Sequence, residues 1–425
     1  MCSFYFLDNC MIFFFLGLIN SILFVHTDDW SVGRDLDNIH TIDITELFFF
    51  GQGSGNFISR EIGHKNYQEA SEMASTGFFS ALATGVLICV MGLLFLEPLA
   101  YLLGSTDTIL PYTKAYLSVI LLGALVLMLP IASVQRIWTP FHEALFTSTS
   151  AVCVTGLSVI DVGVELSRFG QGVLIVLVQL GGLGTMTVGT FFLVLIGRRL
   201  SLANEFAVMN AYGAKGVRGW RGLVLWAVLS TSAVELVGMC MLHAVVPGQS
   251  WFRCCFYAVM SFCNAGFSLD PGSLAVFQRY PLALLTMGGL LTLGGFGFLV
   301  LYNLCTIQFW RRNLVARGRL SFHARVVLLG SLVLVVLALV CVFTAEWNGA
   351  LEPYSLSEKL GVGIFQAVTP RTCGFTVIPI HELSPVTRFI TAVLMFIGAA
   401  PGSTGGGVKV TTIAVVILTI RSVAQ

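Results

Sequence analysis

A short motif that recurs three times is the feature that most constrains how this chain folds. Thr147–Leu157 reads TSTSAVCVTGL, Phe256–Leu269 reads FYAVMSFCNAGFSL and Phe365–Val377 reads FQAVTPRTCGFTV. In each copy, a short apolar stretch leads into small and hydroxyl-bearing residues and then a glycine. The three glycines follow one another at intervals of 110 and 108 residues: Gly156, Gly266 and Gly374. A near-constant period of this kind predicts an internal structural repeat.

The composition indicates an integral membrane protein. Of the 425 residues, 56% are hydrophobic and only 11% are charged, whereas soluble domains carry roughly 25% charged residues. Several apolar runs are long enough for membrane helices. The eleven cysteines show no metal-binding spacing such as C-x-x-C, which favours buried free thiols. No nucleophile–base pair or metal cluster indicates an enzyme, and we expect no covalently bound cofactor and no nucleic-acid partner.

From about Ala124 the chain reads as repeated units of helix, short hairpin and helix. The hairpins, over residues 138–157, 251–269 and 360–377, are too short to cross roughly 30 Å of hydrocarbon as helices. Non-helical backbone at membrane depth persists only where it lines a cavity or is buried in protein. We therefore predict an all-α polytopic membrane protein with helix–re-entrant hairpin–helix units around a pore. The predicted spans are residues 115–131, 172–197, 220–246, 281–310, 325–343 and an interrupted stretch over 389–420.

The basic residues predict the orientation. They gather in the two links between repeats, and basic loops stay in the cytoplasm. These residues are Arg198, Arg199, Lys215, Arg218, Arg221, Arg311, Arg312, Arg317, Arg319 and Arg325. We expect a plasma (cell inner) membrane protein whose hairpins enter from the outer face.

A short helix followed by an extended glycine segment is typical of an ion filter, in which backbone carbonyls replace the water shell of the ion. Glycine adopts the backbone conformations that successive inward-pointing carbonyls require. No Asp or Glu lies in the three glycine segments. This absence disfavours a divalent-cation filter, which usually carries a carboxylate ring.

The motifs CVTGL, CNAGFSL, TPRTCGFTV and FIGAAPGSTGGGVKVTT resemble the Trk/Ktr/HKT superfamily of potassium transporters, and within it the KtrB-type membrane subunit. The resemblance covers about residues 124–425, with repeats at 124–200, 215–312 and 324–425, three of an expected four. It implies potassium uptake, with K⁺ or Na⁺ as the transported ion. It also implies that the filter is formed by backbone carbonyls of Val154, Thr155, Gly156, Asn264, Ala265, Gly266, Thr372, Cys373 and Gly374.

A separate Gly-rich stretch, Gly398–Lys409, interrupts the last predicted span because its glycines and Pro401 do not continue a helix. The resemblance implies a loop under the filter that gates the pore. Its residues are Gly402, Ser403, Thr404, Gly405, Gly406, Gly407 and Lys409. A phosphate-binding loop is the alternative for the letters STGGG-x-K. For Lys409 itself, tuning the inner pore and snorkelling to the interface both stay open.

The resemblance further implies a homodimer in contact with lipid and a cytoplasmic ring of nucleotide-binding regulatory subunits. Residues 1–123 form a separate N-terminal membrane segment. Within it, GQGSGNFISREIGHKNYQEASEMASTGFF and LEPLAYLLGSTDTILPYTKAYLSVILLGA resemble the multidrug and toxic compound extrusion (MATE) family over about residues 44–123. Two alternatives therefore remain: a fragment of a MATE-type drug/cation antiporter, and a non-conducting truncated fusion.

Three further expectations concern single features. The repeat period predicts a fourth filter glycine at about residue 483, a position past Gln425. Glu235, an ionisable residue within a predicted span, is expected to have a structural partner, for which we suggest Arg371. The small-residue runs at 181–186 and 294–298, GGLGTM and GGFGF, are interpreted as close helix packing.

Overall fold

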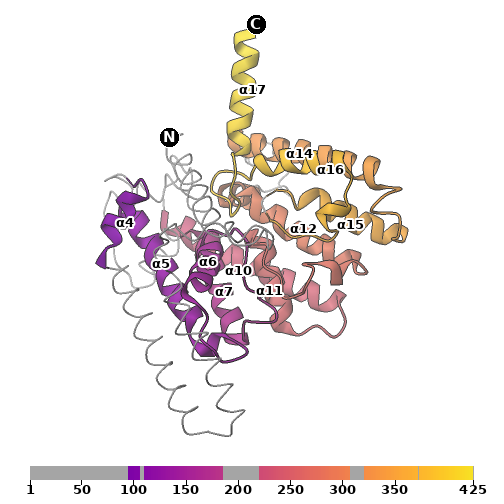
Figure 1. Ribbon diagram of the computed structural model, residues 1–425. Coiled ribbons are helices and arrows are strands. Elements are labelled where there is room, and N and C mark those ends of the chain that lie inside the picture. The colour runs from indigo at the N-terminus through magenta and orange to yellow at the C-terminus, as the bar shows by residue number, and fades with distance from the viewer. Residues whose placement is uncertain (1–93, 106–109, 185–219, 307–319, 372, 425) are drawn as a thin grey trace, which may run out of the picture. The chain divides into compact units, whose positions relative to one another are not determined.

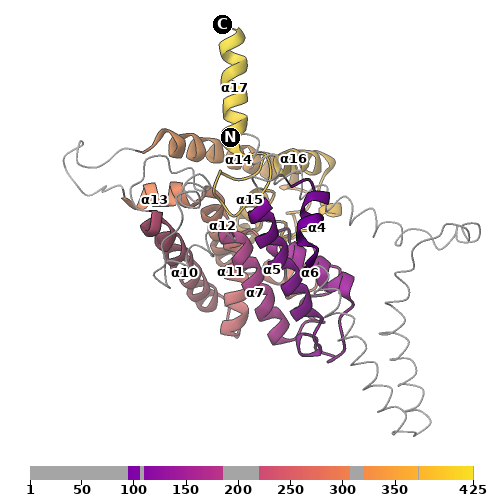
Figure 2. The ribbon, with the colours of Figure 1, turned by 90° about the vertical axis from the view of Figure 1, so that its left-hand side faces the viewer.

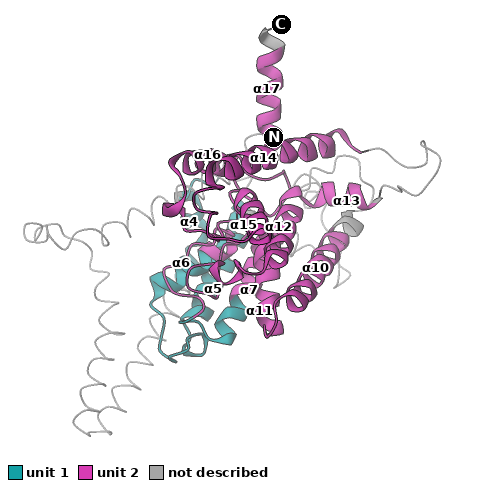
Figure 3. Ribbon diagram, turned by 90° about the vertical axis from the view of Figure 1, so that its right-hand side faces the viewer, with its two compact units in different colours: residues 1–149, 164–173 teal, residues 150–163, 174–425 magenta. Residues whose placement is uncertain are grey.

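The structure is a computed structural model that describes residues 94–105, 110–184, 220–306, 320–371 and 373–424 (Figure 1). These residues form helices and, apart from two isolated β-bridges, no strands. They fall into two compact units: residues 1–149 with 164–173, and residues 150–163 with 174–425 (Figure 3). Both basic links, except Arg325 and the backbone of Arg221, and the N-terminal segment up to residue 93 lie outside the described residues.

In unit 1, a hydrogen bond between two helices and an isolated β-bridge hold the chain together. Ser148 is fully buried and donates from Oγ to the carbonyl oxygen of Ile120 at 2.7 Å, which ties α6 to α5. An antiparallel bridge joins Ser133 to Leu166 where the chain returns. The helices of this unit are α4 (Leu96–Leu102), α5 (Leu110–Met128), η1 (Pro130–Ala132), most of α6 (Phe141–Val152) and the start of α7 (Arg168–Leu183).

Unit 2 contains two groups of helices. In one group, α10, α11 and α12 pack on one another; in the other, α15 and α16 both pack on α14; and α12 with α15 joins the two groups. Besides the end of α7, the unit holds α10 (Trp220–Val245), α11 (Trp251–Cys263), η2 (Ala275–Phe277), α12 (Pro281–Phe296), α13 (Phe298–Thr306), α14 (Phe322–Glu346), α15 (Leu356–Val368), η3 (Ile380–Glu382), α16 (Pro385–Phe396) and α17 (Val410–Ala424).

Serine residues define where these helices begin. Ser250, Ser321 and Ser384 each accept a hydrogen bond from the backbone N–H three residues further on, at 3.1–3.3 Å. These bonds satisfy N–H groups that have no partner inside the helix. At α15, Ser355 and Glu358 form a capping box. The pKa of Glu358 is lowered because its carboxylate accepts hydrogen bonds from the backbone N–H and hydroxyl of Ser355.

Two of the described helices, Val224–Val245 and Phe322–Glu346, are long and apolar enough to cross a membrane. The predicted span over 281–310 is not one straight helix: α12 and α13 are together long and apolar enough to cross a membrane, but they meet at a bend of 100°. Residues 307–310 lie outside the described residues. Gly297 has a positive φ of 83° at the bend. The N–H of Phe298 donates to the carbonyl oxygen of Gly402 at 3.0 Å instead of continuing the helix. Figure 2 shows α13 beside α10, where Trp226 and Tyr302 meet edge to face.

The last predicted span is interrupted as expected. Helix α16 ends at Phe396, and α17 begins at Val410. The intervening backbone returns on itself, and a parallel bridge joins Ile397 to Val408.

A buried carboxylate at the end of α14 fixes the start of α16. Glu346 is 1% exposed and accepts from the backbone N–H of Ser384 at 2.9 Å. We predict that Glu346→Ala lowers stability by about 1–3 kcal/mol, because it leaves the partly buried N–H of Ser384 without this acceptor. Glu346→Gln, which keeps a side-chain oxygen, loses less.

Thermal unfolding in detergent measures this difference. Glu352→Ala is the control, since Glu352 is exposed six residues further on and surface changes usually stay within about 0.5 kcal/mol. Equal melting temperatures for Glu346→Ala and Glu352→Ala contradict the assigned role.

Candidate functional site

The three glycine segments, with residues 154–156, 264–266 and the described residues 373 and 374, come together within unit 2. A methyl group on Gly156 would overlap the backbone nitrogen of Gly266. A methyl group on Gly266 would lie 2.6 Å from the carbonyl oxygen of Cys373. Residues more than 100 positions apart in the sequence therefore touch backbone to backbone, at a separation that leaves no room for a Cβ atom.

The first two segments leave their helices by the same turn. Val154 and Asn264 have left-handed backbone conformations, with φ of 55° and 60°. The next N–H in each case donates to a carbonyl five residues back, from Thr155 to Ser150 and from Ala265 to Met260, both at 2.8 Å. This bond pattern is that of a Schellman helix end. A β-branched valine at positive φ is strained, so Val154 is held there by its surroundings.

The third segment is built differently. Its Phe365–Gly374 spacing is one residue shorter than the Phe256–Gly266 spacing of the second copy, although Gly374 has a φ of 76°, close to the 79° of Gly156. Cys373 donates its N–H to the carbonyl oxygen of Thr369 at 3.3 Å, and the hydroxyl of Thr369 donates to the carbonyl oxygen of Phe375. The predicted filter residue Thr372 lies outside the described residues.

The predicted filter residues differ in how far they are buried. Asn264, Ala265 and Cys373 are at most 1% exposed, whereas Gly374 is exposed and the residues of the first segment are half-buried. Since none of the three segments carries a carboxylate, the oxygen atoms that they can offer an ion are neutral carbonyl, hydroxyl and amide oxygens.

The predicted gating residues lie in the 397–409 loop, which docks on the bend between α12 and α13. Thr404 donates from its hydroxyl to the carbonyl oxygen of Phe262 at 3.1 Å, just before the second glycine segment. Ala400 donates its N–H to the carbonyl oxygen of Gly295 at 3.1 Å. Inside the loop, Lys409 donates from Nζ to the carbonyl oxygen of Gly405 at 2.7 Å. The loop thus contacts both the helix bend and the end of α11.

The sequence profile of the family described as TrkH, cation transport protein, matches residues 78–425. The chain belongs to the TrkH family. Ktr system potassium uptake protein B of Bacillus subtilis (strain 168) is 35% identical over 308 residues, which are 71% of this chain and 67% of that protein. The crystal structure of the potassium transporter TrkH from Vibrio parahaemolyticus matches 80% of this chain and 75% of its own, with a TM-score of 0.53 and 17% identity. This TrkH-family chain is therefore a membrane protein with a TrkH-like helical fold.

A shorter match is to multidrug export protein MepA from Staphylococcus saprophyticus subsp. saprophyticus. It is 37% identical over 75 residues, which are 18% of this chain and 17% of that protein. The TrkH profile begins at residue 78, inside the segment that resembles MATE transporters. The predicted domain boundary between residues 123 and 124 stays a prediction.

The suggested pairing of Glu235 with Arg371 is wrong. In this TrkH-family chain, Glu235 accepts from the side-chain amide of Gln179 and lies 3.9 Å from Sγ of Cys263. Arg371 is 4% exposed and donates to the hydroxyl of Ser331 at 3.0 Å. Hydropathy alone does not show what Glu235 of α10 and Arg371, which follows α15, contact, and the two side chains have different neighbours.

The small-residue interpretation holds for Gly181 of α7 and Gly294 of α12. A methyl group on Gly181 would overlap the carbonyl oxygen of Val152, and one on Gly294 would overlap that of Phe262. Each glycine therefore lets its helix lie directly against the end of the preceding short helix, α6 or α11. Gly297 is different, since it forms the bend. Thr185 and Met186 lie outside the described residues.

Sequence reasoning missed a polar network around the second glycine segment. Tyr257 donates from its hydroxyl to Asp270 at 2.5 Å, and Arg253 forms an ion pair with the same carboxylate. The available signal was a pair of opposite charges, one on each side of the motif.

We predict that Gly294→Ala disrupts the packing of α12 against α11, because backbone on the other side does not move aside as a side chain does. Overpacking of this kind costs at least about 1–3 kcal/mol. Gly289→Ala on the same helix has open space around the new methyl group, and alanine favours the helix.

Fluorescence-detected size-exclusion chromatography after heating compares the two variants. We expect a lower melting temperature for Gly294→Ala and an unchanged or higher one for Gly289→Ala. The same melting temperature in both would contradict the packing described here.

Proposed function

We propose that this chain takes up potassium across the plasma membrane through a filter that its glycine segments form. The observation that carries the proposal is the backbone contact among Gly156, Gly266 and Cys373 in a member of the TrkH family. The named activity of the relative from B. subtilis, potassium uptake, supports the choice of ion. Transport involves no covalent step, so no enzymatic group is needed.

The proposed mechanism follows from the oxygen atoms in the glycine segments. A monovalent cation loses its water, and backbone carbonyls of residues 154–156, 264–266 and 372–374 replace it. Without a fixed carboxylate, the site does not trap a divalent ion. The glycines let backbone approach backbone closely enough for carbonyls from different segments to share one ion. K⁺ is the proposed substrate, with Na⁺ as the competing ion.

We propose that the helix–hairpin–helix repeats surround one pore, with the hairpins open to the outside and the basic links in the cytoplasm. By the superfamily resemblance, a fourth filter segment completes the ring. The same resemblance supports a homodimer and docking of cytoplasmic nucleotide-binding regulatory subunits on the basic links. The 397–409 loop acts as the gate in this proposal, and its bonds to α11 and to the α12–α13 bend support that role.

Growth of a potassium-uptake-deficient bacterium at low K⁺ tests the function. We predict that Gly266→Ser abolishes rescue, since a side chain at this position meets the carbonyl oxygen of Cys373. Gly289→Ser, in open space on α12, keeps it. The chain is compared with a form extended by a fourth repeat from a relative, and membrane abundance is measured for each.

Rescue by either form, lost on Gly266→Ser alone, supports the filter. If neither form rescues although both reach the membrane, potassium uptake is the wrong function. Export of a drug or dye by this chain would favour the antiporter alternative.

The gate proposal predicts that Thr404→Val raises the rate of K⁺ uptake. Valine keeps the shape of threonine but loses the bond to the carbonyl oxygen of Phe262. A bond worth roughly 1 kcal/mol shifts a closed–open equilibrium about fivefold. Initial ⁸⁶Rb⁺ uptake per transporter measures the change. Thr412→Val, on an exposed position of α17, is the control; an unchanged rate in both variants argues against gating by this contact.

A further inference from the structure

The second glycine segment is attached to helix α11 at both of its ends. At the near end, Asn264 and Ala265 donate their N–H groups to carbonyls of the last turn, at 3.2 and 2.8 Å. At the far end, the N–H of Leu269 donates to the hydroxyl oxygen of Tyr257, two turns back on the same helix, at 3.2 Å. Both ends of the stretch Gly266–Ser268 are therefore attached to the same helix, α11.

The helix sets the separation of these two points. Tyr257 and Cys263 are six residues apart, so their Cα atoms are separated by about 9 Å along the axis. Packing fixes the position of the Tyr257 ring, since the residue is 1% exposed and its ring meets that of Phe277 edge to face at 5.1 Å between centroids. The segment is therefore held at a nearly fixed extension.

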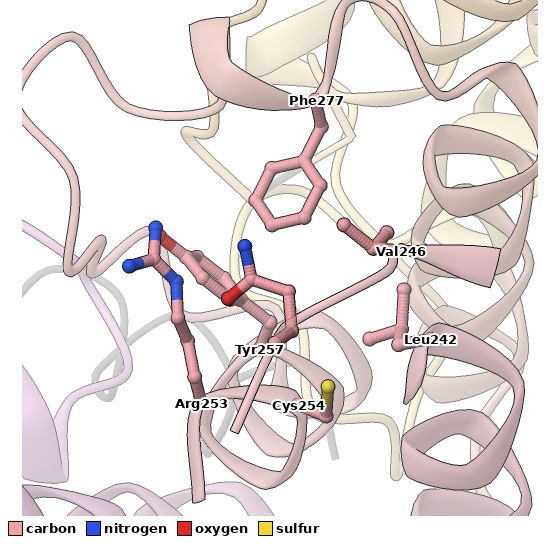
Figure 4. Close-up of a pocket in the computed structure, with 7 residues that line it drawn as sticks. Leu242, Val246, Arg253, Cys254, Tyr257 and Phe277 are labelled. Carbon is pink, nitrogen blue, oxygen red and sulfur yellow. The ribbon is translucent and has the colours of Figure 1, made fainter. Parts of the chain in front are cut away.

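Charged and polar groups hold the tyrosine hydroxyl in place. Asp270, whose side chain is 10% exposed, accepts from this hydroxyl at 2.5 Å and pairs with Arg253. Arg253 lies one turn before Tyr257, and its guanidinium carbon is 5.9 Å from the centre of the tyrosine ring. Figure 4 shows the two side chains rising from the same helix, with Phe277 beyond the ring and a small cavity between them and Leu242 and Val246.

The network continues to the third glycine segment. Ser268 lies 3.1 Å from the tyrosine hydroxyl and donates to the carbonyl oxygen of Ser273 at 3.0 Å. The hydroxyl of Ser273 accepts from the N–H of Thr376 at 3.2 Å, two residues beyond Gly374. Hydrogen bonds therefore connect Tyr257 to the backbone next to two of the three glycines.

The other two copies lack these groups. At the repeat interval, Thr147 stands in the place of Tyr257 and Ile160 in the place of Asp270. In the third copy, Gln366 follows the helix phenylalanine as Tyr257 does, and Ile378 stands where the carboxylate would be. The second segment is thus the one in which an aromatic hydroxyl and a carboxylate fix the extension.

We infer that Tyr257, held by Asp270 and Arg253, is a positioning residue that sets the ion selectivity of the second glycine segment. The inference deepens the proposed potassium-uptake function and rests on it. K⁺ and Na⁺ differ in size by a few tenths of an ångström, so discrimination between them depends on how firmly the carbonyl oxygens are held. A segment released at Leu269 is free to contract around the smaller ion.

The test replaces Tyr257 with phenylalanine, which keeps the ring and its packing. Tyr280→Phe is the matched control, since Tyr280 lies at the start of α12, away from these bonds. Uptake of K⁺ in competition with Na⁺ is measured on the full chain at equal membrane abundance. We expect Tyr257→Phe to raise the KM for K⁺ and to lower the K⁺ over Na⁺ preference, each by about 3–10-fold, with Vmax retained.

Amide hydrogen exchange reports the positioning without requiring transport. Tyr257→Phe is expected to speed exchange of a peptide over residues 264–270 at least about threefold, while α10 and α12 stay protected. Tyr280→Phe leaves this peptide unchanged. Asp270→Asn is expected to act in the same direction, and the double variant with Tyr257→Phe adds little, because both break one network.

The outcomes separate the two claims. Unchanged exchange in Tyr257→Phe overturns the positioning role whatever the chain transports. Faster exchange with an unchanged K⁺ over Na⁺ preference overturns the selectivity role. If the unsubstituted chain and its extended form take up no K⁺, the proposed function fails and the selectivity role with it, while the exchange result still decides the positioning.

Discussion

Backbone-to-backbone contact among the glycine segments is the constraint on which the rest of unit 2 depends. Gly266 lies between the other two, with Gly156 against its nitrogen and the carbonyl of Cys373 against its α-carbon. Three backbone segments lie this close together only if the helix before each segment ends and the chain changes direction there. The left-handed residues Val154 and Asn264 make that turn, at a cost in strain for the valine.

The helices behind the segments follow from the same requirement. Gly181 and Gly294 remove the side chains that would push α7 and α12 away from the ends of α6 and α11. The break at Gly297 then gives the 397–409 loop a place to dock, where the N–H of Phe298 donates to Gly402, while Thr404 of the loop donates to Phe262 at the end of α11. Glycine thus serves three purposes in one region: contact between segments, support from behind, and a bend that receives the loop.

The three copies of the motif are similar in sequence and unequal in structure. The first two end their helices with the same pair of hydrogen bonds, whereas the third is one residue shorter and uses the hydroxyl of Thr369. The second carries a tyrosine and an aspartate that tie it to its own helix. Such inequality means that the three segments are held in place by different contacts, although their glycines recur at nearly the same interval.

The sequence by itself determined the membrane character and the positions of the glycine segments, because composition and a recurring motif can be read from the order of residues without knowing the fold. It also predicted the interruption at Gly398–Lys409, since no helix continues through that run of glycines. Only the tertiary structure decided which groups meet: that Glu235 contacts Gln179 and Arg371 contacts Ser331, and that α12 bends at Gly297. These outcomes depend on distances between residues far apart in the chain, and hydropathy does not encode the rotation of one helix against another.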